Sequence, residues 1–244
     1  MEVLGIPVDG ITMEEAVATV EGYIEDGTPH QVVTVNPEML MLARRDTGFR
    51  EALLKADLVV PDGVGVVWAS RHLGNPVPER VAGYDLMLSL LEVSARRGYR
   101  VYFLGARGEV VEEAARSARN LFPGLQVAGF HHGYFPAGEE EGVVEGVRYS
   151  QPDLLLVGMG SPRQEKFLAR NLSRLDVPVG IGVGGSFDVL TGRIRRAPLW
   201  MQEAGLEWFY RLVREPYRLG RMLALPRFAW TVLREGKGNG IDRG

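Results

Sequence analysis

The chain has 244 residues and a formal net charge of −3; 45% of its residues are hydrophobic and 24% are charged. These values are typical of a globular protein that buries its own core, and they exclude a collagen-like or wholly disordered chain. The sequence contains no cysteine, which excludes a disulfide framework, a thiolate metal site and a cysteine nucleophile. A negative total charge also disfavours a nucleic-acid-binding function.

The charge is unevenly distributed along the chain. Residues 195–235 contain eight arginines against four glutamates, and residues 236–244 add a net charge of +1, so residues 1–194 carry −8. This pattern predicts an acidic body over residues 1–194, which is the α/β domain by the pattern described below, and a basic, aromatic-rich appendage over residues 195–244. We expect the appendage to be helical, interrupted at Pro216 and Pro226, with a disordered tail over 236–244.

The N-terminal segment and the hydropathy pattern predict a cytoplasmic protein. Residues 1–7 lack the basic and apolar regions of a signal peptide. No run of about 18 apolar residues is present that would form a transmembrane helix.

Six short apolar segments predict β-strands that are buried on both faces. They are, in chain order, Gln31–Asn36, Asp57–Pro61, Arg100–Gly105, Gln126–Phe130, Asp153–Gly158 and Val177–Val183. Amphipathic segments predict helices over Met13–Ile24, which begins with a Thr12/Glu15 capping box, and over Tyr84–Arg97, Glu109–Leu121, Glu139–Tyr149 and Pro162–Asn171. This alternation predicts a Rossmann-like α/β fold, an open, mostly parallel sheet with helices on both faces, followed by the C-terminal helical appendage.

Three of the predicted strands end in glycine-rich turns, at residues 105–108, 158–161 and 182–186. Ligands of doubly wound sheets bind beyond the carboxyl ends of the strands, where small residues let a phosphate or sugar approach backbone N–H groups. Glycine also suits any tight turn, so the pattern favours a nucleotide-type ligand without requiring one. The dinucleotide and P-loop fingerprints are absent from the sequence, which disfavours a dehydrogenase or a P-loop NTPase.

Polar side chains at the strand ends are the candidate site residues. Thr34 and Asn36 share one side of a strand because side chains alternate with a period of two, and Asn36 also suits a helix N-cap. Asp62 follows a strand within a Pro-Asp-Gly turn, where its carboxylate serves the turn, acts as a general base, or does both. Arg80 and Gln164 lie near helix starts and are either surface residues or members of the same site.

No metal or cofactor site is expected. The four histidines match no metal-binding spacing, and the sequence contains no Asp-x-Asp pair that would hold a divalent ion.

Four arginines of the appendage are spaced to share one face of a helix, namely Arg211, Arg214, Arg218 and Arg221. Aromatic residues are interleaved with them. The face is either simply solvated, a surface for lipid phosphates, or a site for a diphosphate. Single-stranded nucleic acid would use the same residue types, but the acidic body argues against it.

Seven motifs together resemble those of the WecG/TagA/CpsF family of bacterial glycosyltransferases (glycosyltransferase family 26). They are Thr-Val-Asn-Pro-Glu at 34–38, Pro-Asp-Gly at 61–63, Arg-Val-Ala-Gly-Tyr-Asp at 80–85, Gly-Ser-Pro-Arg-Gln-Glu at 160–165, Gly-Val-Gly-Gly-Ser-Phe-Asp at 182–188, Arg-Ala-Pro-Leu-Trp-Met-Gln at 196–202 and Gly-Leu-Glu-Trp-Phe-Tyr-Arg-Leu at 205–212.

The resemblance implies an inverting, metal-independent transferase that uses a UDP-sugar and no cofactor. It would move N-acetylmannosamine to undecaprenyl-diphosphate-linked N-acetylglucosamine (GlcNAc), giving a β-linked disaccharide lipid for a polymer such as wall teichoic acid. The uronic acid of that sugar or a glucose-type donor is the alternative within the family. The enzyme would act peripherally at the inner face of the cell membrane, and a homo-oligomer is left open.

The resemblance also assigns roles to residues. Asp62 would be the catalytic base, and Thr34, Asn36, Arg80 and Gln164 would line the sugar site. The UDP-sugar would contact Gly105, Ala106, Tyr134, Gly160, Gly184, Gly185 and Asp188, and Arg211, Arg214, Arg218 and Arg221 would bind the acceptor's diphosphate.

Two other classes of function remain as alternatives. A nucleotide-sugar epimerase would need a nicotinamide fingerprint, which the sequence lacks. A non-catalytic module that binds anionic membranes would not need polar residues at several different strand ends.

Overall fold

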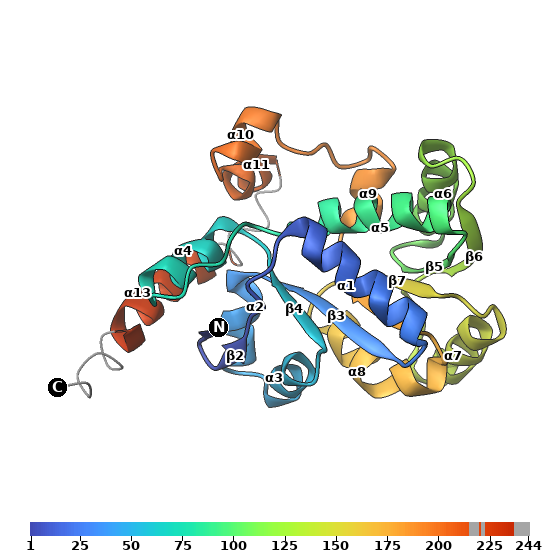
Figure 1. Cartoon of the computed structure of the whole chain (residues 1–244), viewed down its shortest axis with the longest axis horizontal. Coiled ribbons are helices and arrows are strands. Elements are labelled where there is room, and N and C mark those ends of the chain that lie inside the picture. Colours follow the sequence, from blue (N-terminus) through green and yellow to red (C-terminus); the bar gives the residue numbers. More distant parts are fainter. Residues whose placement is uncertain (215–219, 221–222, 237–244) are drawn as a thin grey trace.

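The computed structural model describes residues 1–214, 220 and 223–236. Its centre is a parallel sheet whose six strands are ordered β4-β3-β8-β7-β5-β6 (Figure 1). The strands are β3 (His30–Val35), β4 (Leu58–Pro61), β5 (Arg100–Gly105), β6 (Gln126–His131), β7 (Leu154–Gly158) and β8 (Val179–Gly182). The six predicted strands are therefore confirmed, with ends that shift by one or two residues.

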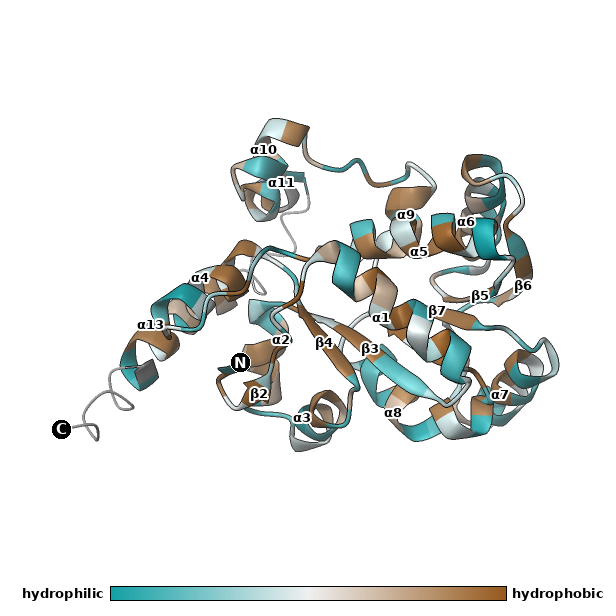
Figure 2. Ribbon diagram, in the orientation of Figure 1, coloured by the Kyte–Doolittle hydropathy of each residue, from teal (hydrophilic) through white to brown (hydrophobic). Residues whose placement is uncertain are grey.

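Helices cover both faces of this sheet, as the sequence predicts. One face carries α1 (Met13–Asp26), α5 (Gly83–Arg97), α6 (Gly108–Leu121) and α9 (Ser186–Leu190). The other carries α2 (Pro37–Ala43), α3 (Thr47–Leu54), α7 (Glu140–Tyr149) and α8 (Arg163–Leu175), and a 3₁₀ turn, η1 (Ala137–Glu139), directly precedes α7. Because side chains alternate along a strand, Val32 packs in the first core and Val33 in the second. Figure 2 shows apolar residues gathered on strands such as β4 and both apolar and polar residues on the helices.

Local sequence explains where the helices begin and end. The Thr12 hydroxyl accepts the Glu15 N–H at 3.1 Å and the Glu15 carboxylate accepts the Thr12 N–H at 2.8 Å, which confirms the capping box of α1. All five predicted helices are present. The short helices α3 and α4 (Val64–His72) and the hairpin of β1 (Glu2–Val3) and β2 (Ile6–Pro7) were not predicted, because segments of two to nine residues show too little periodicity.

The C-terminal region is helical within the described residues. It contains α10 (Leu199–Glu203), α11 (Glu207–Arg214) and α13 (Ala224–Gly236). Figure 1 shows α10 and α11 as a small lobe, whereas α13 runs beside α4. Pro226 does not interrupt a helix as predicted; it lies in the first turn of α13, where a proline removes no intrahelical hydrogen bond. Pro216 and residues 237–244 of the predicted tail lie outside the described residues, and Gly236 ends α13.

The helix α13 is part of the body's core. It packs against α2 and α4, and the side chains of Phe228 and Val232 are buried in the same cluster as Val3 and Ile6 of the N-terminal hairpin. An ion pair of 2.7 Å between Arg44 Nη1 and Glu235 Oε1 joins its end to the end of α2. Among the described residues, no helix is both long and apolar enough to cross a membrane.

Candidate active site

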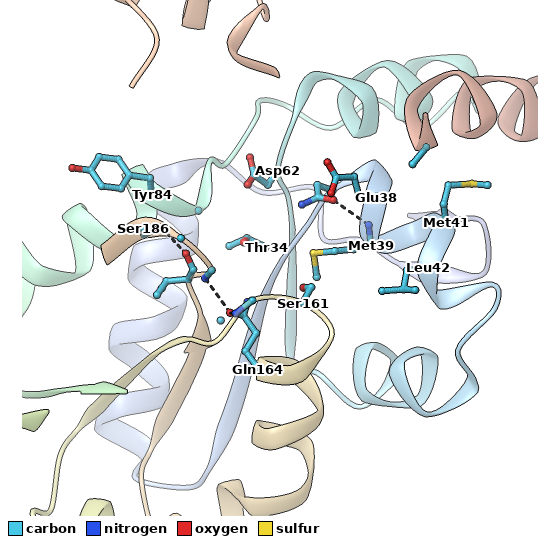
Figure 3. A pocket seen from close by; sticks show the side chains of 18 of the residues that line it. Thr34, Glu38, Met39, Met41, Leu42, Asp62, Tyr84, Ser161, Gln164 and Ser186 are labelled. Carbon is cyan, nitrogen blue, oxygen red and sulfur yellow. Dashed lines mark hydrogen bonds between the residues drawn. The ribbon is translucent and has the colours of Figure 1, made fainter. Parts of the chain in front are cut away.

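A cavity of about 500 Å³, here called the larger cavity, lies at the carboxyl ends of β3, β4, β7 and β8. β3 and β8 are neighbours in the sheet, and the helices that follow them, α2 and α9, pack on opposite faces, so a crevice opens between the two strand ends, where doubly wound proteins bind ligands. Figure 3 shows Thr34, Asp62, Ser161 and Gln164 around this space. Seven predicted site residues line it, namely Thr34, Asn36, Asp62, Gly160, Gln164, Gly184 and Gly185.

A smaller cavity of about 170 Å³ adjoins the larger one. The predicted residue Arg80 lines it, together with Trp208 of α11. The two cavities share five lining residues, Asn36, Glu38, Asp62, Gly83 and Tyr84. Asp62 therefore stands on the wall between them.

Backbone contacts hold Thr34, Asn36 and Asp62 close together. The Asn36 side-chain oxygen accepts the Met39 N–H at 3.1 Å, so Asn36 is the predicted N-cap of α2. The Asp62 N–H donates to the Val35 carbonyl at 2.8 Å, which continues the β3–β4 ladder by one residue. A Cβ atom on Gly83 would lie 2.8 Å from Thr34 Oγ1, so glycine is required where α5 begins against β3.

Gln164 joins the two glycine turns of the larger cavity. Its side chain is 4% exposed, and its amide oxygen accepts the N–H groups of Gly160 at 3.1 Å and Gly184 at 3.0 Å. A Cβ on Gly182 would overlap the Gln164 amide nitrogen, so this arrangement needs glycine at the end of β8. The glycine-rich turns were expected to present backbone N–H groups to a phosphate, but the N–H groups of Gly160 and Gly184 donate hydrogen bonds to Gln164 instead. A ligand meets the bare Cα atoms there, because a Cβ on Gly160, Gly184 or Gly185 would have no atom within 4 Å.

A buried carboxyl group fixes the orientation of that amide. Glu165 is 1% exposed, and its Oε1 accepts the Ser161 hydroxyl at 2.7 Å and the Gln164 amide N–H at 2.8 Å. Burial raises the pKa of Glu165 above its ordinary value of 4.5, outweighing both hydrogen bonds. The folded protein retains this proton at a pH where an unfolded glutamate has lost it. The contribution of Glu165 to the free energy of unfolding therefore falls as the pH rises from 4.5 toward the raised native pKa.

Charged residues attach α11 to the wall of the smaller cavity. Glu207 Oε2 lies 3.6 Å from Arg80 Nη2, and Glu207 Oε1 lies 3.4 Å from Arg196 Nε. Arg196 also pairs with Asp85, with Nη2 and Oδ2 at 2.7 Å, and its guanidinium lies 5.1 Å from the centre of the Tyr84 ring. Arg80 is thus held by Glu207 of the appendage, and α11 forms part of the wall of the smaller cavity.

The other predicted site residues line neither cavity. Gly105 is the last residue of β5, where a Cβ would overlap the backbone of Gly158, and Ala106 begins the turn that follows. Tyr134 is 70% exposed, and Asp188 lies in the first turn of α9.

The four predicted arginines of the appendage are only partly described. Arg211 and Arg214 belong to α11, and the Arg214 guanidinium lies 5.6 Å from the Tyr210 ring centre. Arg218 and Arg221 lie outside the described residues.

Two arginines and an apolar wall at the larger cavity were not predicted. Arg45 follows α2, and Arg227 comes from α13. Arg227 belongs to the basic segment of the sequence but falls outside the spacing of the four selected arginines, and no pattern marks Arg45.

In the described part of the chain, no cluster of three or more His, Cys, Asp or Glu residues is arranged to hold a metal ion.

Comparison with known proteins places this chain in a class of sugar transferases. Residues 1–240 match the sequence profile of the Glycosyl transferase WecG/TagA/CpsF family. The chain is 37% identical to the N-acetylglucosaminyldiphosphoundecaprenol N-acetyl-beta-D-mannosaminyltransferase of Bacillus subtilis (strain 168), over 88% of this chain and 83% of that protein. It is 33% identical to the protein of the same name from Staphylococcus aureus (strain MW2), over 95% of this chain and 91% of that protein. The chain therefore belongs to the WecG/TagA/CpsF family.

Proposed function

We propose that this protein transfers N-acetylmannosamine from a UDP donor to the GlcNAc of a diphosphoundecaprenol-linked acceptor. The names of the relatives support the transferred sugar and the acceptor. The observation that carries the proposal is the place of Asp62 on the wall shared by two adjoining cavities. A transferase needs a base between donor and acceptor, whereas a membrane-binding module does not.

The site supports a direct displacement at the anomeric carbon. The donor sugar lies in the polar part of the larger cavity against Thr34 and Gln164, with its diphosphate over the glycine turns and the N-terminus of α8. The acceptor hydroxyl enters from the smaller cavity and gives its proton to Asp62. Its oxygen forms the new bond as the bond to UDP breaks, and UDP leaves with the electron pair. Attack from the face opposite UDP inverts the anomeric centre.

Release of UDP from a panel of donors tests this function. With a GlcNAc-diphosphate-lipid acceptor, UDP–N-acetylmannosamine should release UDP. A chelator should leave the rate unchanged, because in this mechanism the N-terminus of α8, and not a metal, stabilises the leaving diphosphate. NMR of the product should show a β linkage. Absence of UDP release with every donor would reject the proposal, and loss of activity with chelator would reject the metal-independent mechanism.

We further propose that the enzyme works on the inner surface of the cell membrane as a peripheral protein. The proposed acceptor is a lipid, and the described helices of the appendage expose large apolar side chains, with Leu199 74%, Trp200 63% and Trp230 70% exposed. Residues 195–235 also contain eight arginines against four glutamates and so carry a net positive charge. Exposed aromatic residues beside arginines suit the boundary between lipid headgroups and acyl chains.

Sedimentation with anionic vesicles tests this location. The whole chain should sediment with the vesicles, and a Leu199→Ser/Trp200→Ser variant should bind them several-fold less because apolar area at the interface is lost. Leu121→Ser on α6, where leucine is 55% exposed, is the matched control and should bind as the unaltered chain does. Equal binding by all three proteins would contradict a docking role for α10.

A further inference from the structure

The larger cavity has two chemically different ends. Thr34, Asp62 and Gln164 surround one end, and α2 and α13 form the other. The second end is apolar, with side chains from Met39, Met41, Leu42 and Ala224. In Figure 3 the two labelled methionines and Leu42 lie on the α2 side, away from Tyr84 and Ser186. A nucleotide sugar has no long apolar part to place against this end.

Two cationic side chains border the apolar end. Arg45 follows α2, and Arg227 lies three residues after Ala224 on α13, so Ala224 and Arg227 share a helix face. Within the described residues, neither arginine forms an ion pair. A guanidinium binds phosphate oxygens through two parallel hydrogen bonds. The end therefore combines an apolar wall with two groups that suit a diphosphate.

An exposed apolar strip continues along α13 beyond Arg227. Trp230 and Leu233 follow Arg227 at intervals of three residues along α13, and they are 70% and 38% exposed. Phe228 and Val232 are buried on the opposite side of the helix and hold it against α2. The strip is therefore carried by a firmly packed element.

The start of α13 also connects the two cavities. Ala224 lines the larger cavity, and the next residue, Leu225, lines the smaller one, while Glu38 lines both. A ligand that lies across the start of α13 therefore places one end beside Asp62 and the other against α2.

We infer that α2 and α13 bind the diphosphate and the first isoprene units of a polyprenyl-linked acceptor, an assignment that rests on the proposed function. Arg45 and Arg227 contact the diphosphate, in addition to the appendage arginines that the resemblance assigns to it, and Met41 and Leu42 contact the isoprene units. A cavity of about 500 Å³ holds only the beginning of such a lipid, and the remainder follows the strip at Trp230 and Leu233. The acceptor sugar then reaches the smaller cavity beside Asp62.

Acceptors that differ only in the lipid test the apolar part. GlcNAc-diphosphate is joined either to a short isoprenoid or to a methyl group, and both are assayed without vesicles or detergent. A Met41→Gln/Leu42→Asn variant should raise KM for the isoprenoid acceptor about tenfold and leave KM for the methyl acceptor nearly unchanged, because only the isoprenoid buries apolar surface there. Leu54→Asn on α3, where leucine is 46% exposed outside both cavities, is the matched control and should change neither KM.

The arginines are tested against the donor. Arg227→Gln should raise KM for both acceptors and leave KM for the UDP-sugar unchanged. A raised donor KM would place the donor's diphosphate at this end and overturn the inference. An equal change in KM for the isoprenoid and methyl acceptors in the α2 variant would also overturn it. So would a difference between the two KM values that arises only with vesicles, because the apolar wall would then contact bulk lipid and not the acceptor.

Two further measurements keep the result interpretable. Thermal unfolding confirms that each variant is folded, and Met41→Gln alone replaces the double variant if Leu42→Asn destabilises the core. Absence of UDP release by the unaltered enzyme would refute the proposed function. Normal turnover with unchanged lipid selectivity in the variant would refute only the α2–α13 site.

Discussion

Replacing Asp62 by asparagine should lower kcat by roughly 10²–10⁴-fold, the usual contribution of a general base. Asparagine has nearly the same size and retains the backbone N–H that bonds Val35, so the turn after β4 should persist. The amide cannot take the proton of the acceptor hydroxyl. KM for the UDP-sugar should change little, because the proposed donor contacts come from Thr34 and Gln164.

Steady-state UDP release and thermal unfolding of the same preparation measure this effect. Asp57→Asn is a matched control, because Asp57 immediately precedes β4 as Asp62 immediately follows it. The Asp57 carboxylate accepts the Gln31 N–H at 2.8 Å, at the amino end of the sheet. The control should lose some stability and keep its kcat. Near-normal turnover by Asp62→Asn would reject the assignment of the base.

Phe228→Ala should reduce the free energy of unfolding by about 3–5 kcal/mol, although Phe228 lies in the predicted appendage. Its ring is 1% exposed and packs in the core formed by α2, α3, α4 and the N-terminal hairpin. Truncation to alanine removes the apolar contact and leaves a cavity that well-packed neighbours cannot fill.

Denaturant unfolding followed by circular dichroism gives this difference. Trp230→Ala on the same helix removes a larger ring that is 70% exposed, and it should change the free energy of unfolding by only about 0.5 kcal/mol. Equal stability of both variants would mean that α13 does not contribute to the core in solution. The result also shows whether the fold tolerates truncation, because removal of residues 195–244 removes Phe228 and Val232 from this core.

The sheet and most of the helices were predictable because each is specified by a local pattern. A fully buried parallel strand such as Leu154–Gly158 is an unbroken apolar run, and a helix such as Met13–Asp26 carries its own capping box. The grouping of Thr34, Asn36 and Asp62 at one edge was also predictable, because parallel strands place their carboxyl ends together.

Contacts between elements distant in sequence were not predictable in this way. Gln164 joins Gly160 to Gly184 only because β7 and β8 are neighbours in the sheet. The order of the strands cannot be predicted from the sequence of any single segment. The apolar face of α13 indicates that this helix packs against the rest of the protein, but it does not indicate that it packs against α2 and α4. Arg45 and Arg227 reach one cavity as a result of that packing.

The shared core of hairpin and last helix has a consequence for synthesis on the ribosome. Val3 and Ile6 are translated long before the Phe228 that packs in the same cluster. The apolar faces of α2 and α4 must therefore stay uncovered until α13 has been translated, and until then they are exposed to aggregation or bound by a chaperone. Completion of this core is coupled to synthesis of α13, so a chain terminated before α13 would be recognisable by its exposed apolar side chains.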